Sequence, residues 1–355
     1  MDINKLSEQA ITLLKQLISI PSISGEEEQT AGVIKEFLEN DGIRAKRLHN
    51  NIYAANFEFN PDKPTLLLNS HHDTIKPNST WSRDPFLPVS EDGKLYGLGS
   101  NDAGASLVSL LTVFRYFYKK RGLKHNLIFA ATAEEESSGV RGIRAVLPVL
   151  DRIDLAIVGE PTGMQMAIAE KGLIVLRCQA KGVSGHAARD TGENAILNAL
   201  PDIQWFSSYR FPHESELLGP VKMTVTMIGA GTQHNVIPDL CDFTVDIRST
   251  DAYQHQEILQ TIREHVRSDF STPSLDLSPS SIPVTHPLVK AAGKMGIATF
   301  GSPTLSDQTF IAAPSVKIGP GMSERSHTAD EFVFEKEIEQ GIVIYHNLLE
   351  EFLNN

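Results

Sequence analysis

The sequence predicts an α/β fold, in which a split domain holds a mostly parallel sheet between helices, together with an inserted α+β domain. Two observations lead to this prediction. Over residues 1–172, short apolar runs alternate with segments of helical apolar spacing, a pattern typical of a buried parallel sheet. The pattern becomes α+β over 173–280 and returns to α/β over 281–355.

The first part of the split domain opens with two helices. Apolar side chains recur at helical spacing over residues 4–19, and Pro21 ends this helix. Ser24 and Glu27 fit a capping box at the start of the second helix. The other elements expected here are strands over 52–59, 65–69, 127–132 and 155–158, and helices over 103–120 and about 140–149.

The inserted domain is predicted from its own set of strands and helices. Strands are expected over 173–180, 221–228 and 241–247, and helices over 193–208 and 251–268. A segment rich in Pro and Ser, 271–283, then leads back to the split domain. The chain therefore has two predicted domains, one of which is interrupted by the other.

Composition excludes several classes of function. The 355 residues carry a net charge of −12, so phosphate backbones repel the chain and nucleic-acid binding is not expected. The uncharged stretch from Ala103 to Phe114 is far shorter than the roughly 20 residues that a membrane span needs. The N-terminus lacks the pattern of a secretory signal, and Cys178 and Cys241 form no disulfide framework, so a cytoplasmic location is expected.

Polar clusters follow four apolar runs. Each cluster alone is ordinary, because His-x-Asp and Glu-Pro occur in turns and glutamates occur at helix starts. Carboxyl ends of parallel strands meet at one edge of a sheet, so we expect the four clusters to converge there. Buried carboxylates are costly unless they are paired or bind metal, and carboxylates with imidazoles suit Zn²⁺ and related ions. The clusters are His71-His72-Asp73, Asn101-Asp102, Glu134-Glu135-Glu136 and Gly159-Glu160-Pro161.

Eight motifs, in order along nearly the whole chain, resemble those of a known family. It is the family of di-zinc metallohydrolases that includes acetylornithine deacetylase, succinyl-diaminopimelate desuccinylase, aminoacylase and carboxypeptidase G. The motifs are Ser70-His71-His72-Asp73, Gly97-Leu98-Gly99-Ser100-Asn101-Asp102, Glu134-Glu135-Glu136, Gly159-Glu160-Pro161-Thr162, Gly185-His186, Asn235-Val236-Ile237-Pro238, Val245-Asp246-Ile247-Arg248 and Ser326-His327-Thr328-Ala329-Asp330-Glu331.

The resemblance implies that the split domain is a catalytic domain that binds two divalent ions, Zn²⁺ first, with Co²⁺ or Mn²⁺ also compatible. Asp102 would bridge the ions, Asp73 would orient His71, and Glu135 would be the general base. In this register Glu134 takes the place that Asp usually holds. The implied metal ligands are His71, Asp102, Glu136, Glu160 and His327.

The resemblance also implies substrate contacts from the inserted domain, which would act as a lid and make a homodimer. His186 would donate a hydrogen bond to the oxyanion, from the same subunit or from its partner. Arg248 and Asn235 resemble residues that hold the substrate's α-carboxylate, although an Arg at a strand end also suits an ordinary surface. Gly319 and Gly321 resemble a backbone loop that helps to close the pocket.

Two departures from the family pattern bear on the substrate. Ala103-Gly104-Ala105 follows Asp102 where many members have a Met-Lys-Gly type of sequence, and Ser137-Ser138-Gly139 replaces a shorter connection. With the modest length, they favour hydrolysis of an N-acyl amino acid of the N-acetylornithine type, as in arginine biosynthesis. Succinyl-diaminopimelate desuccinylase and a general aminoacylase or dipeptidase remain alternatives, and the acyl group and the amino acid stay open.

Two readings outside this class carry less weight. A non-catalytic binding module on the same fold is disfavoured because all five implied ligands and the base are present. A nucleotide-binding oxidoreductase is disfavoured because Asp102 occupies the sixth position of the fingerprint that Gly97-Leu98-Gly99 begins, where a carboxylate would repel pyrophosphate.

Overall fold

The computed structural model describes residues 3–189, 191–273 and 276–354. The chain divides into two compact units, and the second is inserted into the first. The first boundary falls after Ile168, earlier than the expected residue 172. Gly301–Leu305 also joins the second unit, because Gly301 packs against the backbone of Leu217. The first unit is Met1–Ile168, Ser281–Phe300 and Ser306–Asn355, and the second is Ala169–Ser280 with Gly301–Leu305.

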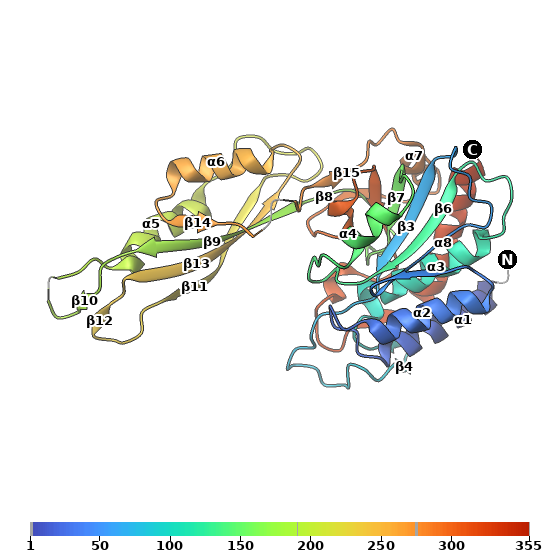
Figure 1. Cartoon of the computed structure of the whole chain (residues 1–355), viewed down its shortest axis with the longest axis horizontal. Helices are drawn as coiled ribbons and strands as arrows, with labels where there is room; N and C mark the ends of the chain where they lie inside the picture. Colours follow the sequence, from blue (N-terminus) through green and yellow to red (C-terminus); the bar gives the residue numbers. More distant parts are fainter. Residues whose placement is uncertain (1–2, 190, 274–275, 355) are drawn as a thin grey trace. The chain divides into compact units, whose positions relative to one another are not determined.

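A nine-stranded sheet forms the centre of the first unit (Figure 1). Its strand order is β1-β2-β6-β3-β7-β17-β8-β15, and β16 pairs with β8. The central pairs β6/β3, β3/β7 and β7/β17 are parallel, whereas β1/β2, β2/β6 and β17/β8 are antiparallel. The strands are β1 Lys46–Leu48, β2 Asn51–Ala55, β3 Thr65–His71, β6 Asn126–Thr132, β7 Leu155–Val158, β8 Met166–Glu170, β15 Ser280–Ser281, β16 Thr299–Ser302 and β17 Ser315–Lys317.

Both faces of this sheet are buried, because successive side chains of its central strands enter different apolar clusters. Leu66 and Leu68 of β3 belong to an apolar cluster that also contains residues of five helices, whereas Leu67 belongs to the cluster on the other face, with Ile143 and Ile311. The five helices are α1 Ile3–Ile18, α2 Glu28–Asn40, α3 Ala105–Phe117, α7 Pro287–Lys294 and α8 Glu335–Asn354. The other face carries α4 Ile143–Val146 and the 3₁₀ turns η2 Leu147–Val149 and η3 Asp307–Phe310.

The capping box expected for the second helix is absent. Helix α2 begins at Glu28, so Ser24 lies too far upstream to cap it, and Glu27 makes no side-chain cap. The Ser24 hydroxyl instead donates to Asp73 Oδ2 at 2.6 Å, and the Glu27 carboxylate accepts from the Gly25 N–H and from Asn50 Nδ2. Both side chains are therefore used in long-range contacts near the clusters predicted from the sequence.

A separate three-stranded antiparallel sheet carries the segment before Asp102. Its strands are β4 Val89–Glu91, β5 Lys94–Tyr96 and β18 Phe332–Phe334. The apolar run that precedes Asn101 and Asp102 therefore does not belong to the main sheet. Its residues pair with β18, and the chain then enters an irregular helical turn, η1 Ser100–Gly104.

The second unit has a four-stranded antiparallel sheet in the order β11-β13-β9-β14 and a short pair, β10 with β12. One face of the large sheet is buried under its two helices, together with the unpaired Cys178 and Cys241. No helix within the described ranges is long and apolar enough to cross a membrane. The elements are β9 Gly172–Lys181, β10 Gly185–His186, α5 Ala195–Ser208, β11 Lys222–Ala230, β12 Val236–Ile237, β13 Leu240–Ser249, α6 His255–His265 and β14 Asp269–Ser271.

Candidate metal centre

Three of the predicted polar clusters lie at the carboxyl ends of adjacent central strands. His71 is the last residue of β3, the three glutamates follow β6 after one residue, and Glu160 follows β7. Because β6, β3 and β7 are neighbours and parallel, their ends meet at one edge of the sheet. This part of the sequence prediction agrees with the structure for a simple topological reason.

Asp73 holds the imidazole of His71 and the glutamate loop together. Nδ1 of His71 lies 3.0 Å from the Asp73 carbonyl oxygen and 3.4 Å from Oδ1. The Asp73 carboxylate also accepts hydrogen bonds from the backbone N–H groups of Glu135, at 3.0 Å, and Glu136, at 3.1 Å. One carboxylate therefore directs His71 Nε2 outward and fixes both residues of the Glu pair.

Asp102 lies between two imidazoles. Its Oδ1 is 3.3 Å from His71 Nε2, and its Oδ2 is 3.6 Å from His327 Nε2. His327 Nε2 is also 2.9 Å from a carboxylate oxygen of Glu136. Ligand atoms of His71, Asp102 and Glu136 all lie within 4.8 Å of one another. Each Asp102 oxygen thus faces a different histidine, as expected of a carboxylate that bridges two sites.

Glu160 supplies the observation that tests this cluster for metal binding. Its Oε1 lies 3.7 Å from His71 Nε2, is buried, and has no hydrogen-bond partner among the described residues. A buried carboxylate oxygen without a partner is costly, and a divalent cation beside His71 would remove that cost. The residues therefore fit a metal centre of imidazole and carboxylate ligands.

The pKa shifts in the cluster follow from burial and from the closeness of its carboxylates and imidazoles. Burial raises the pKa of Glu160 to about 8, and the neighbouring Asp102 adds to this shift. Burial also raises the pKa of Glu136, and His327 opposes that shift. For His71, burial lowers the pKa, but hydrogen bonds to Asp102 and Asp73 outweigh it, so the pKa is raised well above its usual value. Carboxylates crowded in this way attract cations.

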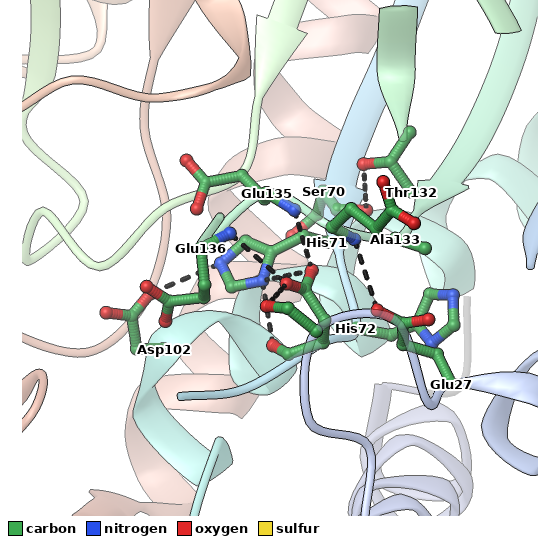
Figure 2. Close-up of polar contacts among 12 residues, drawn as sticks. Glu27, Ser70, His71, His72, Asp102, Thr132, Ala133, Glu135 and Glu136 are labelled. Carbon is green, nitrogen blue, oxygen red and sulfur yellow. Dashed lines mark hydrogen bonds and ion pairs between the residues drawn. The ribbon is translucent and has the colours of Figure 1, made fainter. Parts of the chain in front are cut away.

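Glu135 lies next to this cluster, but its carboxylate takes a different direction from that of Glu136 (Figure 2). Burial raises the pKa of Glu135 well above its usual value, and the charge of Glu160 adds to the shift. A general base works best when its pKa is close to the working pH. The roles of Glu136 as a metal ligand and of Glu135 as the general base stay predictions.

Without metal, the chain is expected to lose thermal stability as the pH rises from about 6.5 to 8. Folded Glu160 keeps its proton up to a pKa of about 8, against 4.5 for an ordinary Glu, so its stabilising contribution is lost as pH rises from about 4.5 to 8, which includes this range. The hydrogen bond to Glu136 raises the pKa of His327 to about 9, which acts in the same direction above pH 6.5. Melting curves with a chelator will measure the trend.

Two controls accompany that measurement. Added Zn²⁺ should flatten the dependence, because cations favour the ionised carboxylates. Glu160→Gln should make it shallower, since this side chain no longer titrates. A metal-free melting temperature that rises from pH 6.5 to 8 would contradict the assigned shifts.

Glu331 belongs to a predicted motif, but no pattern in the sequence indicates its role. Its carboxylate is buried and accepts hydrogen bonds from the backbone N–H groups of Gly99, Asn101 and Asp102, at 3.1, 2.8 and 2.9 Å. Burial raises the pKa of Glu331 to about 8. These contacts join residues more than two hundred positions apart, so they become visible only in the structure.

The two predicted pocket glycines pack closely against the segment around Asp102 and the start of α3. A Cβ on Gly319 would lie 2.1 Å from Ser106 Oγ, and one on Gly321 would lie 2.4 Å from Asn101 Oδ1. The Gly319 N–H donates to Thr162 Oγ1, so this amide is already bonded within the protein. Substrate contact by these glycines stays a prediction.

The predicted residues of the second unit fall into two places. His186 pairs with Val236 across β10 and β12, beside Asn235, whose carbonyl accepts from the Ala187 N–H. Arg248 lies near the far end of β13, about 26 Å along the strand from Leu240 at ~3.3 Å per residue. The unit therefore brings His186 and Asn235 together, but it does not bring Arg248 to them.

Arg248 is also engaged within its own strand. Its Nε and Nη2 donate to the two carboxylate oxygens of Asp246, at 2.9 and 3.0 Å. The Arg248 guanidinium, which was expected to hold the substrate's carboxylate, therefore already binds a carboxylate of the protein in a bidentate way. Roles for His186, Asn235 and Arg248 toward substrate stay predictions.

Comparison with known proteins places this chain in a family. A family model described as Peptidase family M20/M25/M40 matches residues 67–351. The chain belongs to this family. M20-family members are metal-dependent hydrolases that bind a dinuclear metal site, and this chain is an enzyme of that kind. The matched segment includes every predicted ligand, from His71 to His327.

Three M20-family relatives are named succinyl-diaminopimelate desuccinylase. The protein from Delftia acidovorans is 26% identical over 97% of this chain and 98% of its own length. The Corynebacterium glutamicum protein is 28% identical, with 90% of each chain covered. The protein from Buchnera aphidicola is 31% identical over 70% of each chain.

Solved structures support the fold. A tripeptidase from Staphylococcus aureus has a TM-score of 0.79 and 19% identity over 98% of this chain and 99% of its own. A dinuclear metal binding peptidase of the M20 family from Bacillus subtilis has a TM-score of 0.75 and 16% identity, with 99% of each chain covered. The predicted mixed α/β class with a mostly parallel central sheet is confirmed.

Proposed function

We propose that this chain hydrolyses the amide bond of an N-succinyl amino acid of the succinyl-diaminopimelate type. The supporting observation is the match of nearly the whole chain to relatives that carry this name. The N-acetylornithine reaction favoured by the sequence departures has no such support among the relatives described above. The proposed substrate is therefore a succinyl amide in place of an acetyl amide. The proposed role changes from arginine biosynthesis to lysine biosynthesis.

The proposed metal content is two divalent ions, with Zn²⁺ as the native metal. His71 and Glu160 would hold one ion, Glu136 and His327 the other, and Asp102 would contact both. Bound at these residues, divalent ions polarise the scissile carbonyl and lower the pKa of water.

The protein's own groups then account for the proton movements. Glu135 accepts a proton from the attacking water as the new bond to the carbonyl carbon forms, and it returns that proton to the departing amine as the C–N bond breaks. Asp73 maintains the orientation of the His71 ring and the position of the Glu135 backbone during both steps. In this proposal His186 donates a hydrogen bond to the oxyanion.

A panel of amide substrates tests the proposed activity. With Zn²⁺ or Co²⁺, hydrolysis of N-succinyl-diaminopimelate should have a kcat/KM at least about 10-fold above that of N-acetylornithine. A pocket that bonds a distal carboxylate loses those bonds when acetyl replaces succinyl. Equal or faster hydrolysis of acetylornithine, acetylcitrulline or a dipeptide would contradict the substrate assignment and leave the metallohydrolase chemistry intact.

We also propose that the second unit makes a homodimer through the outer edge of its sheet. Within the described part of the chain, strand β11 pairs with one strand, β13, and it carries the exposed Met227 and Ile228. Leu197 and Leu200 of α5 are exposed apolar side chains of the same unit. An unpaired strand edge with exposed apolar side chains is a template for pairing with a second copy.

The chain is therefore expected to be a dimer in solution. Ile228→Lys should shift the mass measured by light scattering from dimer to monomer, because it puts a charge in the pairing edge. Lys222→Ala, at the other end of the same strand, serves as the control and should remain dimeric. A monomeric unaltered chain, or an unchanged mass for Ile228→Lys, would contradict the proposed interface.

A further inference from the structure

We propose that Glu331 is a positioning residue that sets the Asp102 carboxylate between the two halves of the metal centre. The inference rests on the proposed centre. Asp102 does not lie at the end of a main-sheet strand, so the topology that brings His71, Glu136 and Glu160 together does not place it. Another part of the molecule has to fix its position.

The contact begins in the small sheet. Phe332 of β18 pairs with Tyr96 of β5, and the Gly97 N–H donates to the Glu331 carbonyl at 3.0 Å. This pairing continues the ladder by one step and holds Glu331 beside the turn that leads to Asp102. Gly97 and Gly99 have positive φ angles of 148° and 74°, so the backbone can bend sharply there.

The side chain of Glu331 then organises that turn. Oε1 accepts from the N–H groups of Asn101 and Asp102, and Oε2 accepts from that of Gly99. Three backbone donors within the segment 99–102 therefore converge on one buried carboxylate. The Asp102 backbone is fixed through its own N–H, which leaves its side chain directed at His71 and His327.

The same short segment also carries a predicted ligand. His327 precedes Glu331 by four residues, and Asp330 accepts from the N–H groups of Ser82 and Arg83. The segment 327–331 is thus anchored on both sides, and Glu331 links the backbone positions of His327 and Asp102. A displacement of this carboxylate would change the separation of the two side chains, now 3.6 Å between Nε2 and Oδ2.

Glu331→Gln is the sharpest test, because it keeps the size of the side chain. The amide has one acceptor oxygen, so its NH₂ group must face at least one of the three backbone donors. We expect the dissociation constant for Co²⁺, measured by competition with a chelator, to rise about 10–100-fold. The visible absorption of the Co²⁺ form should also change, because the Asp102 ligand shifts.

Asp202→Asn is the matched control. Asp202 is a buried carboxylate of the second unit that accepts three hydrogen bonds, from Arg267 N, Ser268 N and Ser268 Oγ. Its substitution should lower thermal stability but leave the Co²⁺ affinity and spectrum within about twofold of the unaltered chain. If Glu331→Gln does not fold, Glu331→Asp, which shortens the reach of the carboxylate, should show the same loss of affinity.

The outcomes separate this inference from the proposed function. If the unaltered chain binds Co²⁺ and folded Glu331→Gln or Glu331→Asp binds it equally with the same spectrum, the role of Glu331 is overturned. Equal losses in Asp202→Asn also overturn it, because the effect would then be general destabilisation. An unaltered chain that binds no Co²⁺ overturns the metal centre itself.

Discussion

Replacing Glu135 by Gln is expected to lower kcat for amide hydrolysis by about 10²–10⁴-fold, with the fold and the bound metal retained. The close group of ligand atoms comprises His71, Asp102 and Glu136 and does not include Glu135. Burial has raised the pKa of Glu135 well above its usual value, toward the range of a proton acceptor. Glutamine has nearly the same shape but cannot accept the proton. The measurement is steady-state turnover together with the metal content of the purified variant.

Glu134→Gln is the natural control for this result. Glu134 is adjacent in sequence, and its Oε2 accepts from the Arg141 N–H, which a glutamine oxygen also accepts. Turnover by Glu134→Gln should stay within a few-fold of the unaltered chain. If Glu134→Gln were inactive and Glu135→Gln active, the register of the glutamate triplet would be one residue off.

Replacing Asp102 by Asn is expected to weaken metal binding more than about 100-fold, beyond the effect typical of residues that only support a ligand. Asp102 is the carboxylate whose two oxygens face different histidines, so its charge serves both halves of the centre. Hydrolysis should fall in parallel, and added metal should restore part of it. Metal content after dialysis and a titration of activity with Zn²⁺ will measure both effects.

Asp154→Asn supplies the comparison at the opposite edge of the same sheet. Its Oδ2 accepts from the N–H of Thr65, the first residue of β3, whereas His71 is the last. This variant should keep its metal and its turnover even if it melts at a lower temperature. Retention of two metal ions per chain by Asp102→Asn would contradict the bridging position.

Some residues of the site could be placed from the sequence and others could not, because different kinds of contact hold them. His71, Glu136 and Glu160 follow buried strands that are parallel neighbours, so an apolar run and its polar end were enough to predict their convergence. Asp102 also follows an apolar run, but that run pairs with β18 in another sheet. Its place depends on Glu331, more than two hundred residues later, and no periodicity reveals such a contact.

The second unit shows a different limit. Strands were predicted over 173–180 and 241–247, and the structure contains them as β9 and β13, with side chains that alternate in burial. The same pattern did not reveal that Arg248 pairs with Asp246 two residues earlier on the same strand. The motif resemblance suggests that Arg248 binds a carboxylate of the substrate. Whether a carboxylate of the protein already occupies its guanidinium depends on local geometry, which the motif does not contain.

The split of the first unit has a consequence for synthesis of the protein. His71, Glu136 and Glu160 are made before the inserted unit, whereas His327 is made after it. Domains tend to fold as the chain emerges, so Ala169–Ser280 can form its own core while the metal centre still lacks a histidine. Metal capture by a growing chain is therefore a late event, and ribosome-bound chains that stop before residue 327 should hold the ions weakly.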